Sequence, residues 1–157
     1  MGLDATVYCN CFETGKLKES PPDPASVFVT DDGSLACKSE ELDTLLAFDQ
    51  WLHSRACAHQ DGVLIHHHIG NVALVGLLRE ELKVAANSYP ILLERVLYSG
   101  AHAGDYLAFA DVVNLRAEIN NLSTLQHTAN QSLITTFQDQ MHELVAAALS
   151  TGKPISF

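Results

Sequence analysis

The sequence predicts an α+β protein in which a small antiparallel N-terminal β-sheet packs against a mainly helical body of about five helices. Segments rich in β-branched and aromatic residues gather in the first 38 residues. From residue 39 onward, most apolar residues recur with the periodicity of an α-helix. The chain has 157 residues, the length of one typical domain, so we expect residues 1–157 to form a single domain.

The N-terminal quarter predicts the sheet. Residues 5–12 have the composition of a strand, and the proline-rich segment 20–24 that follows predicts a loop. Residues 27–30 and 35–38 are two apolar runs that flank the Gly-containing turn 31–34, an arrangement typical of a β-hairpin.

The middle of the chain predicts two helices with a short segment between them. Ser39 is a suitable N-cap for a first helix that runs to about residue 58, because acidic residues follow it in the first turn. The histidine-containing segment 63–70 is expected to be extended or irregular. Asn71 then caps a second helix that runs to about residue 87.

Three further helices and a short strand are expected in the last part of the chain. Pro90 opens a third helix, which Gly100 ends, and Gly104 opens a fourth that continues to about residue 122. The tail 154–157 is expected to be a short strand that joins the N-terminal sheet. A fifth helix, from about residue 127 to Ser150, carries one apolar stripe made of Ile134, Phe137, Met141, Leu144, Val145 and Ala148.

Composition and charge restrict the function classes. Hydrophobic residues make up 47% of the chain and charged residues 18%, which excludes a disordered protein, and no apolar stretch approaches the ~20 residues of a membrane span. Nine Lys and Arg against 19 Asp and Glu give a net charge of −10, which disfavours nucleic acid and anionic lipid and favours a basic partner. The N-terminus shows no basic segment followed by an apolar run, so we expect a cytoplasmic protein.

The first helix carries the best candidate for a catalytic site. Asp49, His53 and Cys57 follow one another at four-residue intervals on its apolar face. A carboxylate one turn from an imidazole can orient the ring, as in metal sites and general bases. The alternative is a buried structural pair, in which Asp49 bonds His53 and the surrounding leucines close the site to solvent.

A second group of residues predicts a metal site. Cys9 and Cys11 are expected on one face of a strand, and Cys37 on an adjacent strand. The fourth ligand of a tetrahedral zinc ion could be Cys57, His59 or a residue of the histidine run 66–68, of which His66 and His68 can share a face. The second paired-cysteine knuckle typical of such sites is missing, and the alternative is that these thiols are free and buried.

Other polar residues are expected to have structural or surface roles. Glu81 and Arg116 lie on the apolar stripes of two different helices and are expected to form a buried ion pair that sets helix register. His102, His127 and His142 are expected at the surface, as is His59 if it does not bind metal.

The sequence favours a small acidic cytoplasmic protein without a cofactor that binds a basic protein partner, as an immunity or anti-toxin protein binds its toxin. The alternative is a metal-dependent or general-base hydrolase that uses Asp49 and His53, with zinc or another transition metal as its cofactor. Because the sequence contains no common phosphate-binding, zinc-protease or serine-hydrolase motif, it leaves open whether the protein is an enzyme. It also leaves open the oligomeric state and the identity of the partner.

Overall fold

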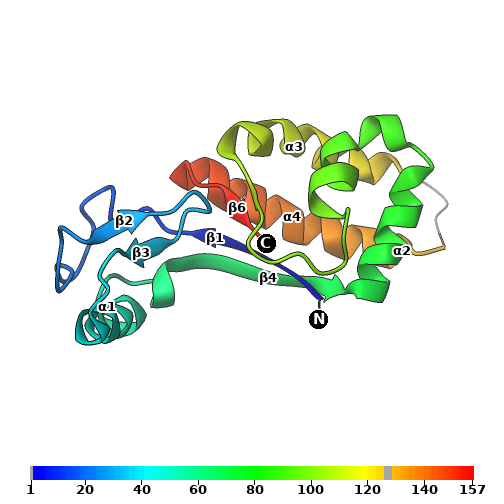
Figure 1. Cartoon of the computed structure of the whole chain (residues 1–157). Coiled ribbons are helices and arrows are strands. Elements are labelled where there is room, and N and C mark those ends of the chain that lie inside the picture. Colours follow the sequence, from blue (N-terminus) through cyan, green and yellow to red (C-terminus); the bar gives the residue numbers. More distant parts are fainter. Residues whose placement is uncertain (1, 126–128) are drawn as a thin grey trace.

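The computed structural model describes residues 2–125 and 129–157 (Figure 1). It contains a four-stranded antiparallel sheet, a separate two-stranded hairpin and helices that cover one face of the larger sheet. The predicted α+β class is confirmed.

The larger sheet has the strand order β4-β1-β6-β5. These strands are β4 (Val63–Asn71), β1 (Gly2–Tyr8), β6 (Ile155–Ser156) and β5 (Tyr106–Leu107). The predicted C-terminal strand is confirmed, because Ser156 of β6 pairs with Thr6 of β1. The sequence predicted only helix from Gly104 to residue 122, whereas the structure places β5 at the start of that segment.

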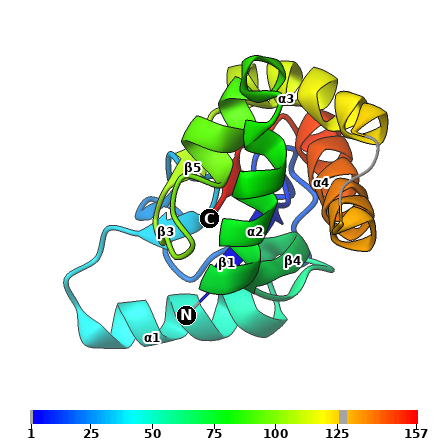
Figure 2. The same ribbon diagram turned by 90° about the vertical axis from the view of Figure 1, so that its right-hand side faces the viewer.

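Side chains alternate between the two faces of β1. Leu3, Ala5 and Val7 are fully buried against α2 and α4, whereas Asp4 and Thr6 lie on the opposite face. Figures 1 and 2 show that α2, α3 and α4 all lie on one side of the sheet. The middle of the other face is open.

The helical body consists of α2 (Val72–Lys83), α3 (Phe109–Asn121) and α4 (Gln131–Thr151). Asn71 caps α2 as predicted, since its side-chain oxygen accepts a hydrogen bond from the backbone N–H of Leu74 at 2.9 Å. Every residue of the predicted apolar stripe of α4 is buried. The short helices are η1 (Gln60–Gly62), η2 (Ala86–Ser88), the π-helical turn η3 (Leu92–Val96) and η4 (Leu122–Thr124).

Residues 9–62 form what we call the N-terminal lobe, at one end of the sheet (Figure 1). The predicted hairpin is confirmed as β2 (Val27–Val29) and β3 (Leu35–Cys37), but it forms its own sheet and does not pair with β1. It packs near α1 (Leu42–Ser54) around a small second core of buried residues, which are Val27, Phe48, Trp51 and Ala56.

Several predicted helix boundaries differ from the structure. Glu41 rather than Ser39 precedes α1, α2 ends at Lys83 rather than near residue 87, and the third predicted helix is the short turn η3.

Two other boundaries differ because the chain turns earlier than its composition suggests. The first strand ends at Tyr8 rather than at residue 12, since the N–H of Thr14 bonds the carbonyl of Asn10 and closes a turn. The first helix ends at Ser54 rather than near residue 58. Both following amides bond the carbonyl of Trp51, which closes the last turn.

In the part of the chain that the structure describes, no helix combines the length and apolar character that a membrane span requires.

Candidate metal centre

Two short cysteine and histidine motifs meet where the N-terminal lobe joins the sheet. Cys9-Asn10-Cys11 directly follows β1, and Cys57-Ala58-His59 precedes η1 and β4. Because β1 and β4 are antiparallel, and Tyr8 pairs with Val63, the end of β1 lies beside the start of β4. The register of this strand pair therefore brings the two motifs together.

The four candidate ligand atoms form a compact cluster, all within 4.8 Å of one another. The sulfur of Cys9 lies 3.7 Å from that of Cys57, and Nδ1 of His59 lies 3.6 Å from the sulfur of Cys11 and 3.7 Å from that of Cys57. In a tetrahedral zinc site, the usual bond lengths separate two sulfurs by about 3.8 Å and a sulfur from a nitrogen by about 3.6 Å. These three distances match those of a tetrahedral Cys3His site, and the other pairs of ligand atoms lie within 4.8 Å of one another.

Hydrogen bonds hold the Cys9-Asn10-Cys11 motif in place. The N–H of Cys9 bonds the carbonyl of Gly62 at 2.8 Å, and the carbonyl of Cys11 accepts the N–H of Lys16, also at 2.8 Å. The side-chain amide of Asn10, between the two cysteines, donates to the carbonyl of Thr151 at the end of α4 at 3.1 Å. The segment that carries Cys9 and Cys11 is thus fixed relative to η1 and to the end of α4.

The surroundings of Cys9 and Cys11 favour the neutral form of these two thiols unless a cation is bound. Cys11 and Cys57 are buried and Cys9 is half-buried. Burial, together with the neighbouring Cys11 and Cys57 side chains, raises the pKa of the Cys9 thiol to about 12. Burial also raises the pKa of Cys11. A metal cation would supply the positive charge that stabilises thiolates. The backbone N–H of His59 donates to the sulfur of Cys57, 3.4 Å away, a contact that suits a thiolate acceptor.

The structure brings together only part of the predicted metal ligand set. Cys9 and Cys11 converge as expected, and two of the alternatives for the fourth ligand, Cys57 and His59, both join them. Cys37 lies in β3 and packs against the small core around Trp51, because the hairpin does not join the sheet of β1. His66 and His68 lie further along β4 on its open face.

The predicted burial of Asp49 and His53 is wrong. Both side chains are exposed, because α1 turns Phe48 and Trp51 into the small core and leaves the face of Asp49 and His53 in solvent. Nδ1 of His53 lies 3.0 Å from a carboxylate oxygen of Asp61, and no hydrogen bond joins His53 to Asp49 within residues 2–125 and 129–157. These residues line a shallow pocket of about 370 Å³ at the surface.

The predicted ion pair between Glu81 and Arg116 is not formed within the described ranges of the chain. Arg116 is exposed on α3, and Glu81 accepts a hydrogen bond from the side chain of Asn130. The buried carboxylate of this region is Glu118, which accepts the N–H groups of Ile91 and Leu92, both at 2.9 Å.

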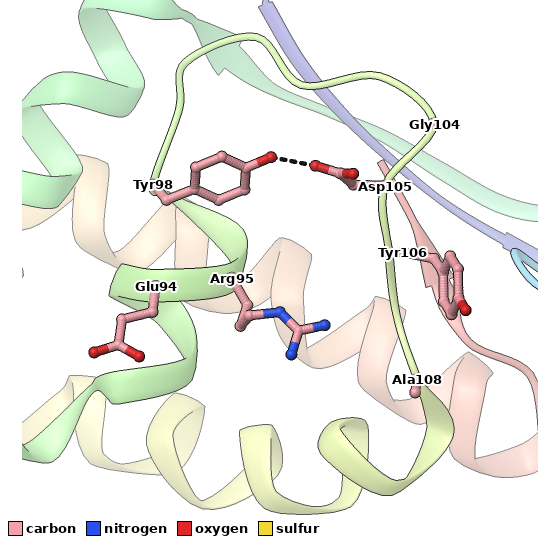
Figure 3. Close-up of a pocket in the computed structure, with 7 residues that line it drawn as sticks. All are labelled: Glu94, Arg95, Tyr98, Gly104, Asp105, Tyr106 and Ala108. Carbon is pink, nitrogen blue, oxygen red and sulfur yellow. Dashed lines mark hydrogen bonds between the residues drawn. The ribbon is translucent and has the colours of Figure 1, made fainter.

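A second cavity, of about 500 Å³, lies between η3, β5 and the start of α3 (Figure 3). Arg95 extends into it, and the hydroxyl of Tyr98 bonds the carboxylate of Asp105 across it (Figure 3). Beside this pair, His102 is buried rather than at the surface as predicted, with Nε2 2.8 Å from the carbonyl of Val96. His142 is half-buried, and the predicted surface position of His127 lies outside the described residues.

Sequence reasoning named Cys57 and His59 only as alternatives for a single fourth ligand, with Cys37 as the third. It looked for a further pair of cysteines and found none, whereas a Cys-x-His motif at residues 57–59 supplies the other two ligands. The signal that could have identified this motif is its position along the chain. It lies shortly before the extended segment that begins at Val63, and Cys9-x-Cys11 directly follows the first strand.

Comparison with known families, curated proteins and solved structures finds no protein similar to this chain.

Proposed function

We propose that this protein binds one structural zinc ion through Cys9, Cys11, Cys57 and His59, and that the ion fastens the N-terminal lobe to the sheet. The observation that carries the proposal is the convergence of three sulfurs and one imidazole nitrogen within 4.8 Å, with three of their separations at tetrahedral distances. Thiolate and imidazole ligands in this geometry select zinc over magnesium, calcium and manganese, which prefer oxygen ligands.

The ligand set supports a structural role for the ion. Four protein ligands fill the coordination sphere of tetrahedral zinc, whereas a catalytic zinc ion keeps one position for water or substrate. The hydrolase alternative has less support, because Asp49 and His53 lie apart from the cluster on an exposed face of α1.

The second core is small, so the N-terminal lobe would gain stability from a bound metal ion. Only four buried hydrophobic residues make up this core, among them Phe48 and Trp51. Small units with few buried residues usually need a disulfide or a metal to be stable, and all four cysteines of this chain are free thiols. Zinc bound between residues 9–11 and 57–59 would close the lobe at its base.

Cys37, the cysteine outside the cluster, provides a matched control for a measurement of zinc content. Zinc content per chain is measured by elemental analysis in untagged wild-type protein, in Cys57→Ser and in Cys37→Ser. The proposal predicts about one zinc ion per chain in the wild type and in Cys37→Ser, and almost none in Cys57→Ser. No stoichiometric zinc in the wild type, or equal loss in both variants, would contradict it.

We also propose that the lobe binds a basic protein partner through α1. Leu42 is 68% exposed and Leu46 is 50% exposed, one helical turn apart. Asp43 and Asp49 lie on the same helix, with no ion-pair partner in residues 2–125 and 129–157, and the whole chain carries a net charge of −10. An apolar strip beside unpaired acids complements a segment that carries leucine-like and Lys or Arg side chains.

A pair of variants tests this surface. Proteins retained from the native host by the wild type are compared with those retained by Leu42→Asp combined with Leu46→Asp, and by Val113→Asp on the exposed face of α3. The proposal predicts a partner that is lost with the α1 variant, is retained by Val113→Asp and elutes at raised salt. A partner lost equally with both variants would refute the assignment to α1.

A further inference from the structure

The open face of the sheet carries a cluster of side chains that the zinc centre does not use. His66 and His68 alternate with His67 along β4, so that the first two point to the open face and are 52% and 61% exposed. His67 points to the opposite side, where Nε2 lies 2.8 Å from a carboxylate oxygen of Glu143 on α4. His66 and His68 therefore lie on the opposite face of β4 from His67, which already contacts Glu143.

Asp4 on the neighbouring strand stands between the two exposed histidines. In the register of β1 and β4, Asp4 pairs with His68 and Thr6 pairs with His66. One carboxylate oxygen of Asp4 lies 2.7 Å from Nδ1 of His68 and 3.9 Å from Nε2 of His66. The hydroxyl of Thr6 lies 3.0 Å from Nδ1 of His66, which orients that ring with Nε2 toward Asp4.

Gly2, at the start of β1, lies directly beneath the imidazole ring of His68. A Cβ atom added at Gly2 would lie 2.7 Å from Cε1 of His68 and 2.6 Å from the carbonyl oxygen of Gly70. A larger residue at position 2 would meet the backbone carbonyl of Gly70 and would displace the end of the His68 side chain from the surface of β1. Glycine at the start of β1 therefore lets the ring lie next to Asp4.

We propose that His66, His68 and Asp4 close into a second metal site, which binds a divalent first-row transition cation such as Ni²⁺, Cu²⁺ or Zn²⁺ at the protein surface. Both rings face one carboxylate oxygen of Asp4, but the three ligand atoms do not all lie within 4.8 Å of one another, so the exposed rings turn when the cation binds. Two imidazole nitrogens and one carboxylate oxygen are ligands that these cations accept. The site differs from the cysteine centre because it has no thiolate and because solvent can fill the remaining coordination positions.

The two metal sites are chemically independent, so they can be tested separately. Untagged protein whose cysteine centre has been loaded with zinc is titrated with Ni²⁺ and followed by calorimetry, while zinc content is measured on the same samples. The proposal predicts one additional equivalent of Ni²⁺ in the wild type and no release of zinc.

Histidine variants on the two faces of β4 provide the matched comparison. His66→Ala and His68→Ala are each expected to weaken Ni²⁺ binding at least 10-fold, and Asp4→Asn is expected to weaken it several-fold, because each removes a ligand or the negative charge. His67→Ala is expected to bind Ni²⁺ as tightly as the wild type. Circular dichroism checks that all four variants are folded.

Three results would overturn the proposal. These are no additional Ni²⁺ equivalent in the wild type, equal binding by wild type, His66→Ala and His68→Ala, or loss of binding in His67→Ala. If zinc fails to bind the cysteine centre, the same titration is run on Cys57→Ser, where the thiolate set is incomplete. Failure of the cysteine centre to bind zinc is therefore distinguishable from failure of His66, His68 and Asp4 to bind Ni²⁺.

Discussion

Replacement of Glu118 is expected to destabilise the whole helical body, although the residue is remote from the metal centre. Its side chain is 7% exposed, and its two carboxylate oxygens accept the N–H groups of Ile91 and Leu92 at the start of the turn that Pro90 opens. A carboxylate at this position satisfies two amides that have no partner within the helix and also interacts favourably with the helix dipole.

The size of the effect follows from the burial of these amides. An unsatisfied buried donor costs roughly 1–3 kcal/mol, and Leu92 is fully buried whereas Ile91 is half-buried and can reach water. Glu118→Ala is therefore expected to lower the free energy of unfolding by about 3 kcal/mol, which corresponds to a fall in Tm of about 6–12 °C for a chain of this length. Glu118→Gln keeps one acceptor oxygen, and we expect about half of that loss.

Urea unfolding followed by circular dichroism measures these differences. The control is Glu94→Ala, which removes an exposed carboxylate from the same turn and is expected to change stability by less than about 0.5 kcal/mol. If Glu118→Ala were no more destabilising than Glu94→Ala, the capping role of the buried carboxylate would be refuted.

Three other perturbations have defined outcomes. Phe137→Ala, in the centre of the main core, is expected to cost about 3–5 kcal/mol in urea unfolding, whereas a loss below 1 kcal/mol would show that the core is not packed as described. Burial raises the pKa of Asp32, but hydrogen bonds from Thr30 and Ser34 outweigh it and hold the pKa below 3.8. The stabilisation from Asp32 is therefore present above that pH and lost as the pH falls through the lower folded value, so Asp32→Asn should show a smaller loss of stability between pH 4 and pH 2 than the wild type; equal losses would contradict this. Removal of zinc by a chelator is expected to speed amide exchange in residues 9–62 while α4 stays protected, and uniform exchange in both regions would contradict a local role for the metal.

Local patterns in the sequence predicted much of the fold because they reflect local geometry. The apolar stripe of α4 repeats with the period of a helix, and the β-branched and aromatic content of the N-terminal segment and the turn residues of the hairpin are local signals. The end of β1 could not be predicted in this way. Residues 9–12 resemble a strand in composition, but their hydrogen bonds go to a turn and to η1.

The candidate sites depend on which surfaces meet, and periodicity alone does not show this. The apolar face of α1 was expected to bury Asp49 and His53, but the small core it faces covers only Phe48 and Trp51. The same reasoning paired Glu81 with Arg116, whereas the helices bring Glu118 to the first free amides after Pro90. A helical period identifies an apolar face but not how much of it a neighbour covers.

The metal centre was half predictable for a related reason. Cys9 and Cys11 were identified as ligands from their spacing, Cys37 was expected as the third, and Cys57 and His59 were two of several candidates for the fourth position. The choice among them required the antiparallel register in which Tyr8 pairs with Val63, which is a non-local property of the fold.

X-ray absorption at the zinc edge tests the central claim most directly, since it reports the atoms bound to the metal in the intact, untagged protein. Three sulfurs at about 2.3 Å and one nitrogen at about 2.0–2.1 Å are expected for zinc held by Cys9, Cys11, Cys57 and His59. Cys37→Ser should leave this spectrum unchanged. A zinc spectrum made only of nitrogen and oxygen ligands, or a protein that retains no zinc, would contradict the assignment.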